Sequence, residues 1–181
     1  MNILYISWLI VLLITRFIHP ILEKLNPTLK NWDVIHSNVK DMSNYGWIDD
    51  VIVLLMGVIL LVNFKNVNFL ETSKAVTFFY SLRLLCILTT QLADPEKTDH
   101  CKAHNHKRLG ACTDKFFSGH TSIMLILASA LSMAFPKYKI FYWIMTMFVS
   151  MFAIITRDHY TIDVIMPWVL FYFYTNKTFK L

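Results

Sequence analysis

The sequence predicts an all-α membrane protein whose six transmembrane helices form a single bundle. Of its 181 residues, 56% are hydrophobic and only 16% are charged, which is unusual for a soluble domain of this length. The apolar residues gather in six long runs, and polar connections separate these runs. With only 4 glycines and 5 prolines, the chain has no flexible linker, so we expect residues 1–181 to form one membrane domain.

The six apolar runs are the predicted transmembrane helices. Crossing the hydrocarbon core takes about 17–25 helical residues, or slightly fewer in a thin bilayer. The runs are residues 3–18, 48–64, 75–92, 119–135, 140–156 and 161–174. The first run lacks the cationic start and the cleavage site of a signal peptide, so we expect it to be retained. Pro167 is expected to kink the last run, because proline removes a helix hydrogen bond.

The distribution of lysines predicts that both termini face the cytosol. With six spans, the termini share one side of the membrane with connections 65–74 and 136–139. These connections and the C-terminal tail carry six lysines and one acid, whereas charges nearly balance in connections 19–47 and 93–118. By the positive-inside rule, the lysine-rich side is cytosolic. The net charge of +5 therefore reflects lysines that flank the membrane, and the chain has no basic stripe for nucleic acid.

Two polar motifs lie at the non-cytosolic ends of the predicted helices. SGHT (residues 118–121) begins the fourth run, and RDHYTID (residues 157–163) separates the fifth run from the sixth. Ionisable residues at membrane depth are costly and usually serve a function. The topology brings His120 and His159 to the same membrane surface, so the two motifs are candidates for one site.

His159 and Asp163 have the spacing of neighbours on one helix face. If the sixth helix begins near Asp158, side chains four residues apart lie next to each other. The carboxylate would then accept a hydrogen bond from one imidazole nitrogen and leave the other nitrogen as a nucleophile. The alternative is that Asp163 only stabilises the positive end of the helix dipole.

The SGHT motif predicts the start of a helix that can bind an anion. Ser118 is a favourable N-cap, and Gly119 permits close approach of the backbone. His120 then falls in the first turn, where N–H groups and the helix dipole favour phosphate. The alternative is that SGHT only caps a transmembrane helix. Taken together, both motifs supply a nucleophile, an orienting carboxylate and an acid–base partner.

The two motifs resemble those of the type 2 phosphatidic-acid phosphatase superfamily. FFSGHT and HYTIDV are similar to the sphingomyelin synthase pattern, and FFSGH with TRDHYTID also resembles the phosphatidylcholine:diacylglycerol cholinephosphotransferases. FFYSLRLLCILTTQLADP resembles the third span of the synthases, in which Arg83 matches an arginine. The resemblance covers residues 78–174 and implies a six-helix fold whose catalytic half is about residues 75–175.

The resemblance also implies a phosphohistidine mechanism. His159 would be the nucleophile, Asp163 its orienting group, and His120 the general acid that later acts as a base. Cations and helix N–H groups can hold the phosphoryl charge, so we expect neither a metal nor another cofactor.

Two departures separate the chain from the phosphatases of this superfamily. Their Lys-x6-Arg-Pro motif is missing, and Ala153 stands where their third motif has arginine. Both departures favour head-group transfer over hydrolysis. In the synthases a Cys-Gly-Asp sequence precedes the serine motif; here Cys112 and Asp114 match it, but Thr113 replaces the glycine.

The sequence therefore predicts a lipid head-group phosphotransferase. It would move phosphocholine or phosphoethanolamine from a phospholipid to ceramide or diacylglycerol. The alternatives are a lipid phosphate phosphatase of the same superfamily and a non-enzymatic lipid-binding or scaffold protein. Short spans suit a thin bilayer, so we expect the endoplasmic reticulum, the Golgi or another endomembrane.

Further side chains are candidates for binding the substrate. The candidates for the phosphate are Arg83, Asp114, Lys115, Ser118, Gly119 and Arg157. Arg83 could instead form a structural ion pair with Asp163 or Asp50, and Lys115 and Arg157 could extend to the interface. The candidates for a choline cation are Tyr45, Trp47, Asp49, Asp50, Tyr160 and Trp168. The aromatic residues among them could instead anchor the protein at the membrane interface.

The connection 93–118 contains two cysteines and several histidines. On an oxidising side of the membrane, Cys101 and Cys112 are expected to form a disulfide. The alternative is a zinc site made of these cysteines with His104 and His106, although the spacing fits no familiar zinc motif. Cys86, inside the third run, is expected to be inert.

Overall fold

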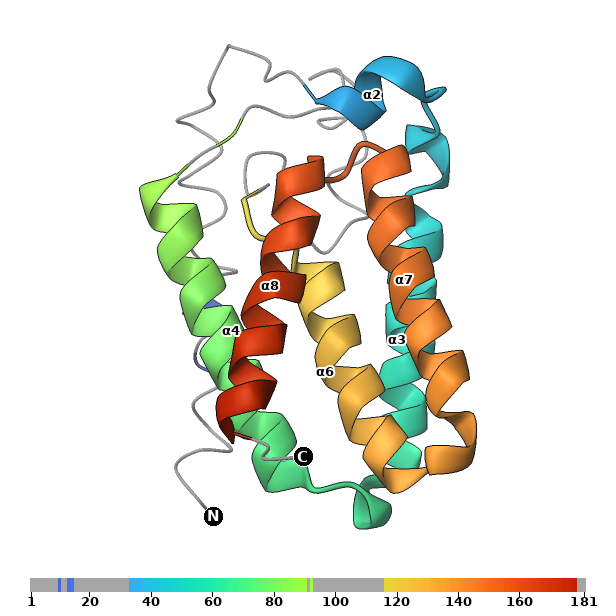
Figure 1. The fold of residues 1–181 in the computed structure, drawn as a ribbon, viewed down its shortest axis with the longest axis vertical. Coiled ribbons are helices and arrows are strands. Elements are labelled where there is room, and N and C mark those ends of the chain that lie inside the picture. Colours follow the sequence, from blue (N-terminus) through green and yellow to red (C-terminus); the bar gives the residue numbers. More distant parts are fainter. Residues whose placement is uncertain (1–9, 11–12, 15–32, 91, 93–115, 179–181) are drawn as a thin grey trace.

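The computed structural model describes residues 10, 13–14, 33–90, 92 and 116–178, and all regular structure in this part of the chain is helical. Figure 1 shows the long helices packed side by side, with the short helix α2 at the end of the bundle drawn uppermost. The long helices are α3 (Trp47–Val62), α4 (Phe69–Thr89), α6 (Gly119–Ala134), α7 (Lys139–Ile155) and α8 (Thr161–Thr178). The short helices are α2 (Val34–Asn38), η2 (Ser43–Tyr45), η3 (Phe64–Asn66) and η4 (Pro136–Tyr138).

The helices follow five of the six predicted runs. The bounds of α3, α6 and α7 lie within two residues of the prediction. Helix α4 begins six residues early, at Phe69, because the side chain of Asn68 caps it by accepting a hydrogen bond from the Glu71 N–H. Pro167 lies inside α8, which continues beyond it to Thr178. The first predicted run falls almost entirely outside the described residues.

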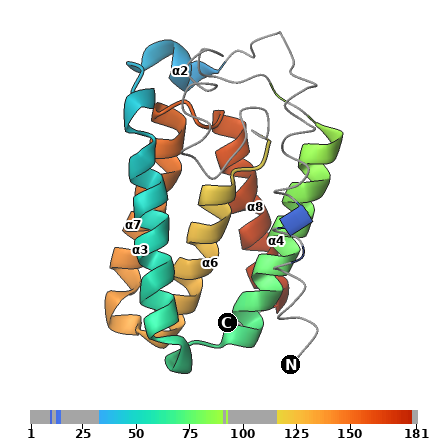
Figure 2. The same ribbon diagram turned by 180° about the vertical axis from the view of Figure 1, so that it is seen from behind.

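Helix α6 lies at the centre of the bundle. Figures 1 and 2 show α3, α6 and α4 in one layer, with α7 and α8 on one side of that layer and running lengthwise along the bundle. One face of α6 packs against α3 and α7 through buried residues that include Met124 and Leu131. A second face, which includes Leu125, packs against Phe79 of α4 and Phe171 of α8. The helix that carries SGHT is therefore fixed on several sides by apolar contacts.

The outer surface of the bundle is apolar along α3 and α7. Leu54 and Val62 on α3 and Ile140 and Ile144 on α7 are among the large hydrophobic residues that are exposed. The segments Ser43–Val62 and Pro136–Ile155 are each long and apolar enough to cross a membrane. These two segments support membrane association, and the six-span arrangement stays a prediction.

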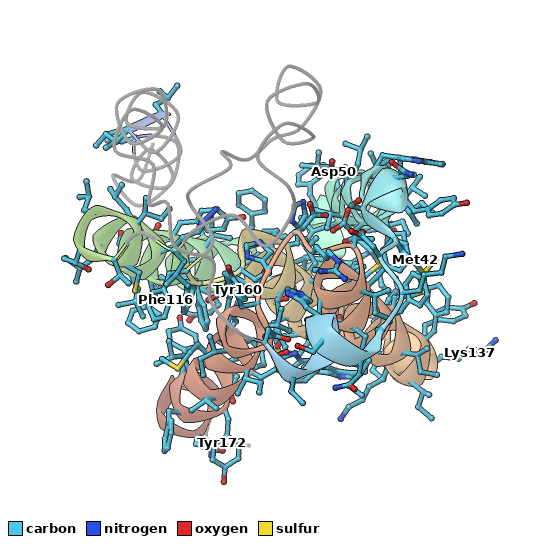
Figure 3. The ribbon with its side chains drawn as sticks, turned by 90° about the horizontal axis from the view of Figure 1, so that it is seen from above. Met42, Asp50, Phe116, Lys137, Tyr160 and Tyr172 are labelled. Carbon is cyan, nitrogen blue, oxygen red and sulfur yellow. The ribbon has the colours of Figure 1, made fainter. Side chains whose placement is uncertain are left out.

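One end of the bundle gathers the polar motifs. Helices α3, α6 and α8 begin toward this end, α7 ends there, and α2 lies above it (Figure 1). Viewed from this end in Figure 3, Tyr160 of the second motif lies near the centre of the bundle, whereas Lys137 and Tyr172 lie at its periphery. The fold thus places both histidine motifs at the same end, as the sequence predicts.

Candidate active site

The first half of the candidate site is the start of α6. The Ser118 hydroxyl accepts a hydrogen bond from the Thr121 N–H at 3.2 Å, which confirms the predicted N-cap. The Ser118 N–H donates to the main-chain carbonyl of Asp163 at 2.9 Å. The two motifs, far apart in the sequence, are therefore joined directly by a backbone hydrogen bond.

The second half is the turn between α7 and α8, which holds His159 in place. Arg157 has a φ of 60°, a left-handed conformation that is uncommon for any residue other than glycine. The His159 N–H donates to the Ala153 carbonyl at 3.1 Å, and the Thr156 hydroxyl donates to Asp158 Oδ2 at 3.0 Å. His159 itself is buried. A strained, hydrogen-bonded turn thus fixes the backbone of His159 while its side chain is buried, and such strain is common at functional sites.

Asp163 lies beside His159 but not on a shared helix face. Helix α8 begins at Thr161, the first residue of the predicted run, so His159 precedes the helix and the condition for a shared helix face, a start near Asp158, is not met. Asp163 Oδ2 accepts a hydrogen bond from the Tyr160 N–H at 3.0 Å, an arrangement in which a third-position carboxylate caps the helix start. His159 Nδ1 lies 4.0 Å from the same oxygen. That is an ion-pair distance, and catalytic hydrogen bonds often shorten only when substrate binds.

The two histidines face each other across this end of the bundle. Their ring centroids are 6.5 Å apart, and the ring planes are inclined by 68°. Reacting atoms approach to about 3–3.5 Å, so a gap of this size is suited to one phosphorus atom between the rings.

Asp50 of α3 is the partner of His120. The His120 Nε2 and Asp50 Oδ1 atoms are 2.7 Å apart, and the two side chains are 23% and 21% exposed. The sequence interpretation placed Asp50 near Arg83 or a choline cation instead. The resemblance begins at residue 78 and so says nothing of α3. The sequence feature that could have indicated this partner is the pair of successive acids, Asp49 and Asp50, in the first turn of an otherwise apolar helix.

Arg83 packs against the start of α6. Its guanidinium is buried and donates from Nη1 to the Phe117 carbonyl at 3.3 Å. A Cβ atom on Gly119 would lie 3.0 Å from Arg83 Nε, so glycine leaves the space that the arginine occupies. The positive charge of Arg83 therefore lies against Gly119, the residue that precedes His120.

Arg157 contacts the segment that contains α2, residues 33–41, which is called the α2 segment below. Its Nη2 donates to the His36 carbonyl at 3.1 Å, and its Nε lies 3.1 Å from Asp41 Oδ2. His36 Nε2 in turn donates to the Ile154 carbonyl at 3.0 Å. The α2 segment is thus attached to the turn that carries His159, and the guanidinium of Arg157 is engaged in that attachment.

Asp33 connects the same segment to the start of α8. Its carboxylate accepts hydrogen bonds from the Thr161 N–H at 2.7 Å and from the Thr161 hydroxyl at 3.0 Å. Burial alone would raise the pKa of Asp33, but hydrogen bonds from Thr161 and His36 outweigh it and lower the pKa. Burial lowers the pKa of His36, and the charge of Asp33 opposes this only in part. The sequence interpretation missed both residues, because nothing local in the sequence indicates contacts across such a separation.

The aromatic candidates for a choline cation have different surroundings. Tyr45 and Trp47 are 50% and 58% exposed. Tyr160 is buried, with its ring centroid 5.6 Å from that of His36. The Trp168 N–H donates to the Ser150 hydroxyl at 3.1 Å. Of these four residues, Tyr160 lies within the histidine motif itself.

Several predicted residues lie outside the described part of the chain. They are Asp114 and Lys115, the cysteines of the expected disulfide (Cys101 and Cys112) and the two histidines of the alternative zinc site (His104 and His106). Their roles stay predictions.

Comparison with known families identifies the region that holds both motifs. Residues 111–178 match the family described as PAP2 superfamily C-terminal, a stretch that covers less than half of the chain. Among curated proteins, the search returned no significant match. The family match supports the resemblance drawn from the two histidine motifs at the level of the superfamily. The sphingomyelin synthase branch stays a prediction.

Proposed function

We propose that the protein is a membrane enzyme that transfers phosphoryl-linked head groups between lipids through a phosphohistidine. The observation that carries the proposal is the pair of facing histidines, His120 and His159, with their ring centroids 6.5 Å apart and a carboxylate beside each ring. The match of residues 111–178 to a phosphatidic-acid phosphatase-type superfamily supports chemistry on lipid phosphates.

In the first step, His159 attacks the phosphorus of a phospholipid. Its Nδ1 lies toward Asp163, which leaves Nε2 as the nucleophile. The new N–P bond forms as the P–O bond to diacylglycerol breaks. Protonated His120 donates its proton to the departing oxygen, and Asp50 stabilises the positive charge of this imidazolium beforehand. The products are diacylglycerol and a phosphohistidine that carries choline or ethanolamine.

In the second step, the head group passes to a lipid acceptor. Neutral His120 takes the proton of a ceramide or diacylglycerol hydroxyl, whose oxygen attacks phosphorus as the N–P bond breaks. Both histidines thereby regain their starting states. Transfer requires that water stay away from the intermediate, so we expect the acceptor to enter from the bilayer.

The phosphate is held from α4 and α6 in this proposal. The first N–H groups of α6 and the Arg83 guanidinium both lie near His120 and suit an anion. Ala153, where the phosphatases of the superfamily have arginine, is fully buried in α7. Arg83 would supply from α4 a positive charge that α7 does not provide.

Hydrolysis by the same residues is the second candidate function. About a fifth of the side-chain surface of His120 and of Asp50 is exposed, which would give water a path to the acid–base histidine. A phosphatase would use the same first step, and water would replace the lipid acceptor in the second.

One assay separates the two candidates. Purified protein is placed in liposomes with head-group-labelled phosphatidylcholine and fluorescent ceramide or diacylglycerol. Label in the acceptor lipid supports transfer, and a water-soluble labelled head group supports hydrolysis. If neither product forms, and phosphatidylethanolamine as donor also gives none, the enzymatic proposal is wrong.

We place the active site on the non-cytosolic face of an endomembrane. The lysine distribution and the short predicted spans support this position. Protease protection of an epitope inserted after Tyr138, in sealed microsomes, tests it. Cleavage of that epitope only from the outside of the vesicles is expected, and protection would reverse the topology.

A further inference from the structure

The start of α3 and the start of α6 form a group of three side chains that suits a metal ion. Asp49, Asp50 and His120 each offer one ligand atom, and these atoms lie within 4.8 Å of one another. Asp49 is not used in the two steps above.

The carboxylate of Asp49 is buried and only partly satisfied. The residue is 1% exposed, and its Oδ1 accepts a hydrogen bond from the Asp50 N–H at 3.0 Å. Its Oδ2 is buried with no hydrogen-bond partner. A buried polar atom without a partner is costly, and a bound cation would remove that cost.

The donor set indicates which cation fits. Two carboxylates and an imidazole are ligands for ions such as Zn²⁺, which holds oxygen and nitrogen donors at about 2.0–2.2 Å. Adjacent ligands of a tetrahedral ion of this kind lie about 3.3–3.6 Å from each other. His120 Nε2 and Asp50 Oδ1, now 2.7 Å apart, would therefore separate by less than about 1 Å to receive it.

An organic ammonium group fits the cluster less well. Choline recognition relies on aromatic faces around the cation. The aromatic residues nearest the start of α3, Tyr45 of η2 and Trp47 of α3, are half exposed. The buried Oδ2 of Asp49 suits a small ion that is bound directly.

We propose that Asp49, Asp50 and His120 form a site for a divalent cation of the Zn²⁺ type, and that the bound ion inhibits the enzyme. Coordination would occupy the His120 nitrogen that now contacts Asp50 and would hold the ring neutral, so His120 could no longer donate a proton to the leaving oxygen. Binding is independent of the proposed function, whereas inhibition rests on it.

Zinc titration of the purified protein in detergent, against a chromogenic chelator, tests the binding. The background replaces all four candidate ligands of connection 93–118 (Cys101→Ser, His104→Ala, His106→Ala and Cys112→Ser), so that they contribute no zinc. We expect one Zn²⁺ per chain in this background. Asp49→Asn and Asp50→Asn should each weaken binding by about tenfold or more, because each removes a charged ligand.

Asp41→Asn is the matched control, because it removes a carboxylate from the same part of the chain but outside the cluster. It should bind zinc as the background does. Thermal melting without metal checks that each variant is folded. No binding in the folded background, or equal binding by folded Asp49→Asn, overturns the site, and so does stabilisation by choline chloride in place of zinc.

The head-group assay with added Zn²⁺ tests inhibition separately. Activity should fall along the same curve as zinc occupancy in the background, and a chelator should restore it. Full activity at saturating zinc overturns the inhibitory role. Since the titration needs no substrate, its result is independent of whether the proposed function is correct.

Discussion

The two halves of the candidate site differ in how firmly each histidine is held. His159 is buried in a turn whose backbone bonds to Ala153, and the attached α2 segment braces this turn from outside. His120 lies on the first turn of α6, is partly exposed, and has its carboxylate partner on α3. The nucleophile proposed at His159 must be positioned against phosphorus, whereas the acid–base group proposed at His120 must exchange protons. The buried, hydrogen-bonded turn of His159 suits the first requirement, and the partial exposure of His120 suits the second.

Replacing the proposed nucleophile, His159, should have the largest effect on activity. For His159→Gln we expect head-group transfer to fall by a factor on the order of 10⁶, as for other covalent nucleophiles. With phosphorus-labelled phosphatidylcholine, the variant should also form no labelled protein. His120→Gln is the comparison, since it keeps the nucleophile and should still become labelled slowly. A labelled His159→Gln protein would place the nucleophile elsewhere.

Asp163→Asn should come next. The amide can still accept the Tyr160 N–H bond, so the start of α8 should survive, but the negative charge that orients His159 is lost. By analogy with catalytic triads we expect the rate to fall by a factor on the order of 10³–10⁴. Turnover and thermal melting measured together are the check. If the melting temperature of the variant falls and its activity falls only as much as its folded fraction, Asp163 acts only as a cap of α8 and does not orient His159.

Gly119→Ala should have an intermediate effect and test the role of Arg83. The new Cβ would lie 3.0 Å from Arg83 Nε, so the guanidinium must shift. Small displacements of a positioning group can cost up to about 10²-fold in rate, and we expect about tenfold here. Gly57→Ala is the matched control, because its Cβ would meet no atom within 4 Å. It should leave activity unchanged and stabilise α3 by up to about 1 kcal/mol. Equal activity of the two variants would exclude a role for Arg83 at the phosphate.

The smallest expected effect is a change of stability with pH. It tests the contacts between the α2 segment and the turn that carries His159. Burial holds the pKa of His36 below its ordinary value of about 6.5, so the unfolded chain binds its proton first as pH falls. The contribution of His36 to stability is therefore complete above that value and declines as pH drops toward the folded pKa. The melting temperature should be lower at acidic pH than at pH 7.5. His36→Gln should reduce this difference, and an unchanged difference would show that His36 does not cause it.

Hydropathy and local motifs predicted the parts of the structure that depend on nearby residues. Helices α3, α6 and α7 follow the apolar runs, and Ser118 caps α6 as expected. Helix α8 begins at Thr161, the first residue of its predicted run, but the hydrogen bonds from Thr161 to Asp33 were missed because Asp33 is far away in the sequence. The partner of His120 was missed for the same reason, since Asp50 reaches it only once α3 and α6 have packed. Contacts of this kind have no signature in the sequence around either residue.

The main-chain bond from Ser118 to Asp163 has a consequence for biosynthesis. Until α8 has been synthesised, the Ser118 N–H lacks the Asp163 carbonyl that it binds in the folded protein, and the carboxylate beside the proposed nucleophile does not yet exist. A nascent chain that contains SGHT but not yet α8 would therefore be inactive under the proposed mechanism. Under the proposed function, competence to act on lipids would arise only after α8 has been synthesised and has packed against α6.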